Sequence, residues 1–156
     1  MTKESAQELI HVMKEIVEKG IYNLPKQGSQ NKILLQSVLS KRDKFDVVVN
    51  RVARINPSKY TLLLNYPEEG LLRVDVNGPN HVNPDGAKVP CPHVHMRMKD
   101  TGKWDDWAFD LPAVFGNTED CAATVRDFLQ YCQVNNIDEL TICEQGEIKE
   151  NVSDHH

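Results

Sequence analysis

Four segments rich in β-branched and aliphatic residues follow one another in the first half of the chain, and they constrain the fold more than any other feature. They read KILLQSVLS, FDVVVNRVAR, KYTLLLNY and LLRVDVN, with turn-forming residues between them. Such segments predict β-strands. Because the connections are short, successive strands are expected to pair as an antiparallel meander. In the fourth strand, Leu72, Val74 and Val76 share one face, and Arg73 and Asp75 share the other.

Helical patterns flank this meander. Ser5 and Glu8 form a capping box before an apolar stripe, which predicts a helix over residues 5–19. A second helix is expected to begin at Asn117 or Thr118. Further strands are expected over 93–99, 104–111 and 140–143. The predicted class is α+β: an antiparallel sheet of about six strands with an N-terminal helix, a helix in the C-terminal half and a single structural zinc site.

Size and composition limit the number of domains and the class of protein that the chain can form. Its 156 residues, 40% hydrophobic and 26% charged, indicate one α+β domain over residues 1–150 and a disordered tail over 151–156. No apolar run approaches the roughly 20 residues that a membrane-spanning helix needs. The charged N-terminus does not resemble a secretory signal, so we expect a cytoplasmic protein.

The charge of the chain limits its partners. The formal net charge is −5 and the sequence pI is about 5.6. Such a balance argues against a protein whose main task is to grip a nucleic-acid backbone. An acidic surface suits a basic partner instead, although it can equally be a solvated surface with no partner.

The segment PDGAKVPCPHVHMRMK places a cysteine and two histidines on alternate residues. On a strand, His93 and His95 project from the same face about 6.5–7 Å apart at the backbone. Two imidazoles at this spacing can bind one ion from both sides. The alternative is an exposed or hydrogen-bonded histidine pair beside a buried thiol.

Cys91 and His81 can complete a metal site. A regular strand would hold Cys91 about 13 Å from His95, too far to share an ion, but the prolines on either side of Cys91 favour a bend. The long loop from Asn77 to Pro92, which we expect to be irregular, can bring His81 back to the strand. The set His81, Cys91, His93 and His95 suits tetrahedral zinc. Asp75 and Asp85 are substitute ligands.

Four protein ligands would leave no open position on the ion, which indicates a structural site and not an enzyme. The sequence contains no H-E-x-x-H and no deaminase signature. The alternative is a metal-dependent nuclease or phosphodiesterase acting on nucleic acid or nucleotides. In that case Arg97 and Lys99 would contact phosphate beside His93 and His95.

The run DVNGPNHVNPDGAKVPCPHVH, followed by WDDWAFDLP, resembles a small family carried by phages and prophages of Gram-positive bacteria. The resemblance covers residues 75–111. Within that family the chain is similar to type II-A anti-CRISPR proteins that use zinc for stability. The resemblance implies a non-enzymatic inhibitor in the cytoplasm of an infected bacterial host. It would bind the type II CRISPR RNA-guided nuclease and block DNA loading or cleavage, without direct contact with nucleic acid.

Overall fold

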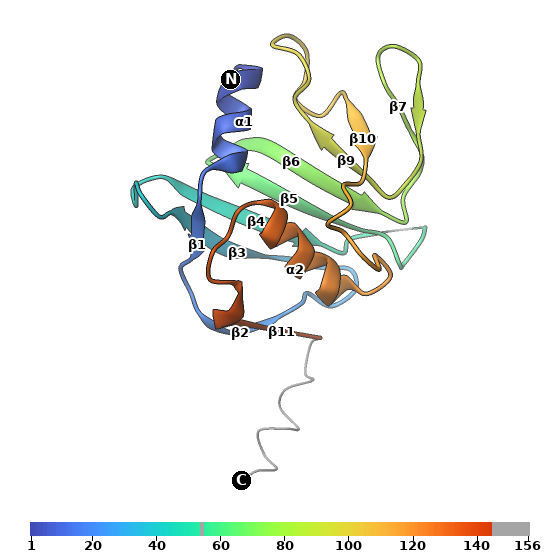
Figure 1. Ribbon diagram of the computed structural model, residues 1–156. Coiled ribbons are helices and arrows are strands. Elements are labelled where there is room, and N and C mark those ends of the chain that lie inside the picture. The colour runs from blue at the N-terminus through green and yellow to red at the C-terminus, as the bar shows by residue number, and fades with distance from the viewer. Residues whose placement is uncertain (54, 145–156) are drawn as a thin grey trace.

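The computed structural model describes residues 1–53 and 55–144, and these form an α+β fold around one large antiparallel sheet (Figure 1). The sheet has seven strands in the order β1-β3-β4-β5-β6-β9-β10. Their bounds are β1 Lys14–Ile16, β3 Gln30–Ser37, β4 Lys44–Asn50, β5 Tyr60–Tyr66, β6 Glu69–Val76, β9 His93–Met96 and β10 Ala108–Asp110. The predicted α+β class, with an antiparallel sheet and two helices, is confirmed, with seven strands where about six were expected; the zinc site stays a prediction. The predicted tail over 151–156 lies outside the described residues.

The remaining elements are two helices, one 3-10 turn and two small sheets. They are α1 Lys3–His11, α2 Cys121–Tyr131, η1 Ile137–Glu139, the parallel pair β2 Gly20–Asn23 with β11 Leu140–Cys143, and the hairpin β7 His81–Val82 with β8 Lys88–Val89. Neither α1 nor α2 has the length and apolarity to cross a membrane, and this holds for every helix of the described residues.

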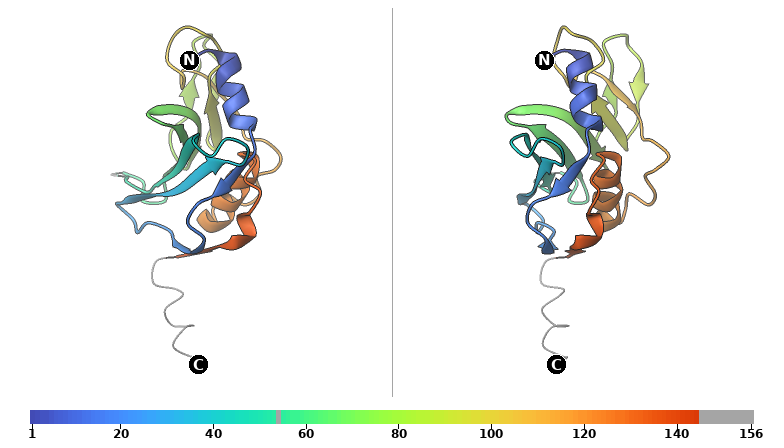
Figure 2. Two further views of the ribbon diagram at one scale, coloured as in Figure 1. Left: turned by 90° about the vertical axis from the view of Figure 1, so that its left-hand side faces the viewer. Right: turned by 60° about the vertical axis from the view of Figure 1, so that its left-hand side comes forward.

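Both helices cover the same face of the sheet, and the core lies between them and the strands (Figure 2). The strands alternate as the sequence predicted. Leu72, Val74 and Val76 of β6 are fully buried in this core, whereas Arg73 and Asp75 point to the opposite face. That opposite face carries the candidate metal donors.

The first helix is shorter than predicted. It ends at His11 instead of residue 19, and residues 14–16 form strand β1 on β3. Lys14 explains the difference. Its ammonium is buried and donates to the carbonyls of Ile10, Val12 and Cys132 at 2.8, 2.9 and 3.0 Å. The bonds to Ile10 and Val12 satisfy carbonyls at the end of α1, and the bond to Cys132 ties the chain at this point to the end of α2.

Two other predicted boundaries were wrong because turns precede the elements. Helix α2 begins at Cys121 with Asp120 as its cap, three to four residues after the predicted start, because residues 117–120 form a turn. The strand predicted over 104–111 is reduced to β10, since Lys103 and Asp106 close a turn before it.

The loop expected to be irregular contains the β7–β8 hairpin, so that expectation was wrong. The turn between its strands is formed by Asn83, Pro84, Asp85 and Gly86, residue types that favour turns, with Gly86 donating its backbone N–H to the Asn83 carbonyl at 2.8 Å. The buried Asn83 side chain bonds both backbone groups of Ala108 in β10. The amide of Asn83 therefore fixes the hairpin to the edge of the sheet.

Candidate metal centre

The pairing of β6 with β9 assembles the centre. In this register Asp75 lies opposite His93, and Arg73 lies opposite His95. Their neighbours Val74 and Val94 also pair and point into the core. Successive side chains of a strand alternate between faces, so the apolar pair on one face places the carboxylate and imidazoles together on the other.

The three donors lie close enough to hold one ion. Nε2 of His93 lies 3.3 Å from Oδ2 of Asp75, and Nε2 of His95 lies 3.1 Å from the same oxygen. One donor atom from each residue lies within 4.8 Å of the other two. A tetrahedral ion with ligands at 2.0–2.1 Å separates its ligand atoms by about 3.3 Å. The two nitrogen–oxygen distances match that value.

Backbone carbonyls orient both imidazoles. Nδ1–H of His93 donates to the Pro90 carbonyl at 3.2 Å, and Nδ1–H of His95 donates to the Asp105 carbonyl at 3.0 Å. A carbonyl can only accept, so the proton stays on Nδ1 and Nε2 is left as the ligand atom. Metal-binding histidines are commonly fixed in this way.

The centre is closed to solvent. His93 and His95 are only 1% and 2% exposed, and the side chain of Asp75 is 15% exposed. Buried polar groups are costly unless they are paired or bind an ion. Deep burial of two imidazoles around one carboxylate therefore indicates a built site.

His81 lies at the edge of this group. Its ring meets that of His95 edge-on with centroids 4.7 Å apart, and lies 6.1 Å from that of His93. Nε2–H of His81 donates to the carbonyl of Asp106 at 2.7 Å, which leaves Nδ1 as the remaining ligand atom. The hairpin thus brings His81 back to the two strand histidines.

Cys91 reaches the other edge of the group. Its thiol donates to the backbone carbonyl of Asp75 at 3.3 Å and also interacts with the side chain of His93. Asp85 does not join, because its Oδ1 accepts from the backbone N–H of Ala87 within the exposed turn. Of the two substitute ligands that the sequence offered, the structure selects Asp75.

The charged and polar side chains of the centre also shift one another's pKa values. Burial would raise the pKa of Asp75, but hydrogen bonds from His93, His95 and Arg73 hold it well below its usual range. Burial would lower the pKa of His93, but the Asp75 and Cys91 side chains raise it to about 10. The arrangement therefore favours positive charge at the Nε2 atoms, which either a proton or a divalent cation can supply.

Arg73 connects the carboxylate to the loop above the site. Its Nε donates to Asp75 Oδ1 at 2.7 Å, and one guanidinium nitrogen donates to Asp105 Oδ2 at 3.1 Å. The ring of Trp104 lies 6.0 Å from the guanidinium and also covers Gly70. These contacts hold the 103–107 loop over the donors.

Arg97 and Lys99 do not extend the donor face. Both lie beyond Met96, where β9 ends. Arg97 donates to the carbonyl of Lys99 at 3.3 Å, and the Lys99 ammonium lies over the ring of Trp107. A phosphate-binding role beside the histidines therefore gains no support from the geometry.

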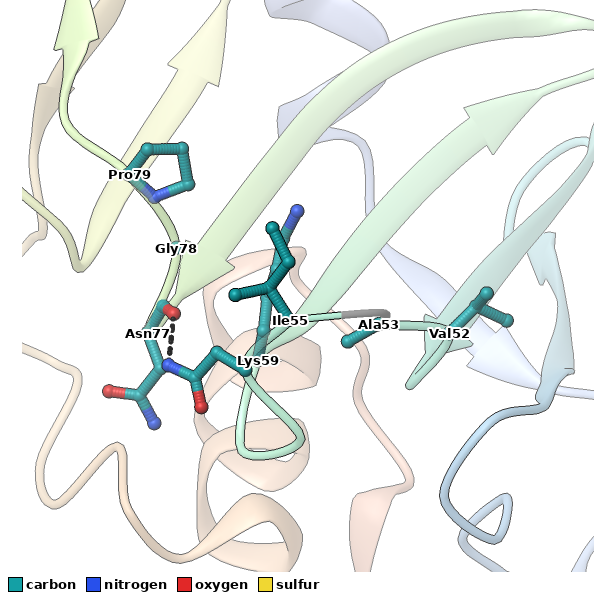
Figure 3. A pocket seen from close by; sticks show the side chains of 8 residues that line it. Val52, Ala53, Ile55, Lys59, Asn77, Gly78 and Pro79 are labelled. Atoms are coloured by element: carbon teal, nitrogen blue, oxygen red, sulfur yellow. Dashed lines mark hydrogen bonds between the residues drawn. The ribbon is translucent and has the colours of Figure 1, made fainter.

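A hollow of about 680 Å³ lies near the Cys91 end of the centre (Figure 3). It is lined by Val52, Ala53, Ile55, Asn56, Lys59, Asn77, Gly78 and Pro79. Lys59 and Ile55 both line it, and Asn56 donates to the Asn77 carbonyl at 3.0 Å. The lining includes none of the metal donors, so the hollow is not an entrance lined by reactive groups.

Comparison with known proteins gives one match. The model of a family described as a family of unknown function (DUF6978) matches residues 1–134 and so includes every donor of the centre. No curated protein and no solved structure matches the chain.

Proposed function

The chain belongs to this family of unknown function, and from its metal centre we propose that it is a non-enzymatic binding protein whose fold is held by a structural zinc ion. The observation that carries the proposal is the closure of the donor set, with His93 and His95 almost completely buried. Catalytic zinc keeps an open position for water or substrate, whereas structural zinc is enclosed by its ligands.

The donors suit zinc in particular. Two imidazole nitrogens and a carboxylate oxygen come from His93, His95 and Asp75. His81 and Cys91 lie beside this group, with their donor atoms outside it, and are the neighbouring candidates for a fourth ligand. Imidazole and thiolate favour zinc over magnesium or calcium, which prefer oxygen. The ion would join β6, β9 and the segment that carries the β7–β8 hairpin.

The proposed binding partner is the RNA-guided nuclease of type II CRISPR systems. The resemblance of residues 75–111 to zinc-stabilised phage inhibitors supports this partner, and so does the net charge of −5. Such a nuclease holds nucleic acid in positively charged channels. An acidic protein is attracted to those channels and repels the DNA that would enter them. The site of action is then the cytoplasm of an infected bacterial host.

Two measurements on protein purified without a histidine tag test the proposal. Elemental analysis is expected to give one zinc per chain. Added to a guide-loaded type II nuclease, the protein is expected to reduce target cleavage and to co-elute with the nuclease. A matched His11→Gln variant, altered at an exposed histidine of α1, should keep both properties. If the native protein contains no metal, the proposed zinc ion is excluded. If target cleavage is undiminished, the proposed inhibitor role is excluded.

The competing function is a metal-dependent nuclease or phosphodiesterase. The burial of both imidazoles opposes it, because a phosphodiester has to reach the ion. Incubation of the protein with RNA, DNA and cyclic nucleotides in Mg²⁺, Mn²⁺ or Zn²⁺ separates the two. Turnover that disappears in His95→Gln would replace the present proposal.

A further inference from the structure

A second hollow, whose lining includes none of the candidate metal donors, lies between α1 and the end of β5. Its volume is about 420 Å³, and it is lined by Ser5, Glu8, Leu9, Val12, Asp43 and Tyr66. We refer to it as the α1 hollow. The α1 residues recur every three or four positions, so they share one face of the helix.

The walls of the α1 hollow combine apolar surface with negative charge. Leu9 and Val12 pack against the core and present apolar surface. Glu8 and Asp43 bring one carboxylate from each side, from α1 and from the β3–β4 turn. A side chain with an apolar stem and a cationic end matches both properties.

Tyr66 adds an aromatic ring and orients one carboxylate. The ring packs on Phe45 with centroids 5.1 Å apart, and its hydroxyl donates to Asp43 Oδ1 at 2.9 Å. This bond leaves Oδ2 of Asp43 to accept from a ligand, because a carboxylate accepts through both oxygens. An aromatic face beside a carboxylate is a common receptor for a guanidinium.

Two neighbouring lysines of the chain are engaged elsewhere. Lys41 pairs with Glu15, and Lys44 donates to Gln36 at 2.9 Å. Within the described residues, neither Glu8 nor Asp43 forms an ion pair. The negative charge of the α1 hollow is therefore available to a partner.

We propose that the α1 hollow receives an arginine side chain of a protein partner. The arginine stem would contact Leu9 and Val12, and the planar guanidinium would stack on Tyr66 and donate to Asp43 and Glu8. Arginine fits better than lysine because its guanidinium offers five donors in a fixed plane and stacks on aromatic rings. The inference rests on the proposed binding function, since it names the chemistry of the partner.

The probe is N-acetyl-arginine amide, titrated into ¹⁵N-labelled full-length protein and followed by NMR. Saturable shifts are expected at Leu9, Val12, Asp43 and Tyr66. The neutral isostere N-acetyl-citrulline amide is expected to cause no saturable shifts. Asp43→Asn should weaken arginine binding about tenfold, as expected for the loss of one charge-assisted hydrogen bond. Asp138→Asn removes the same charge from an exposed site on η1 and should change nothing.

Four results would overturn the inference. They are the absence of saturable shifts in the lining residues, equal shifts with citrulline amide, equal affinity for N-acetyl-lysine amide, and unchanged affinity in Asp43→Asn. The proposed function fails separately. If arginine does not bind but nuclease cleavage is still inhibited, only the α1 hollow is excluded. If arginine binds but cleavage proceeds, the CRISPR nuclease is excluded as the partner.

Discussion

Asp75 and His93 lie opposite each other on neighbouring strands, and this pairing holds Asp75 Oδ2 3.3 Å from His93 Nε2. The same oxygen lies 3.1 Å from Nε2 of His95. One carboxylate oxygen thus contacts two buried imidazoles. The other side chains on this face of the sheet are mostly only half-buried. The stability of that part of the fold should depend on this oxygen.

Replacing Asp75 with asparagine should destabilise the protein by about 3–5 kcal/mol, the range for removal of one partner from a buried charged cluster. The variant should also lose its bound zinc. Urea unfolding and elemental analysis measure the two effects. Asp46→Asn is the matched control, because Asp46 lies on the same sheet and accepts an amide hydrogen bond from Asn65 at 3.0 Å. If both variants lose a similarly small amount of unfolding free energy, the proposed contribution of Asp75 to stability is contradicted.

Removal of zinc by a chelator should lower the Tm of the native protein by about 10 °C or more, because a structural ion contributes directly to folding free energy. The double variant His93→Gln/His95→Gln should already have the lower Tm and should not respond to the chelator. His11→Gln should respond like the native protein. Calorimetric scans with and without chelator measure these shifts, and an unchanged native Tm would exclude a structural ion.

Replacing Gly70 with alanine should destabilise the protein by about 1–3 kcal/mol, the usual cost of overpacking. A Cβ at Gly70 would lie 2.3–2.7 Å from three atoms of the Trp104 indole, so the ring would have to leave its position. The emission of tryptophan should shift as well. Gly116→Ala is the control, because its Cβ would meet only Asp127 Oδ2 at an ordinary 3.8 Å. Equal stability of the two variants would show that Trp104 moves freely.

Lys14 should make stability increase with pH in the alkaline range. Burial lowers the pKa of Lys14 to about 8, against an opposing effect of Cys132, whereas the unfolded chain keeps the ordinary value of 10.5. Between these values the unfolded state binds more protons, so the free energy of unfolding rises with pH, by about 3 kcal/mol over the window.

Unfolding of the native protein and of Lys14→Met between pH 7 and pH 10.5 measures this contribution. The variant lacks the ammonium and should not show the rise. The Cys132 thiol faces Lys14, and burial raises its pKa from 9.0 to about 12, so above pH 9 it lowers the free energy of unfolding as the pH rises. Both proteins keep this thiol, and the ring of Phe45 does not titrate, so the difference between the two pH profiles isolates Lys14. Parallel pH profiles for the two proteins would contradict the assignment.

The meander could be predicted from the sequence because each strand alternates between apolar and polar residues. Leu72 and Val74 face the core and Arg73 faces away, as the period of two requires. The end of α1 could not be predicted in the same way. Val12 and Ile16 fit a helical stripe, and a lysine at position 14 gives no sign that it will be buried.

The candidate site was only partly predictable for a related reason. His93 and His95 are visible as a pair on one strand, whereas Asp75 joins them through strand pairing across the intervening residues 77–92. Spacing along the chain does not show that register. The polar face of β6, with Arg73 and Asp75 on alternate residues, was the available signal. Zinc, the inhibitor role and the partner stay predictions.

The parallel pairing of β2 with β11 has a consequence for biosynthesis. Leu140 pairs with Gly20, about 120 residues earlier. At 5–20 residues per second, a ribosome needs roughly 6–24 s to add that length of polypeptide. During this interval Ile21 and its neighbours have no partner strand and are exposed to chaperones and to other nascent chains. Closure of this small sheet is therefore a late event in the maturation of the molecule.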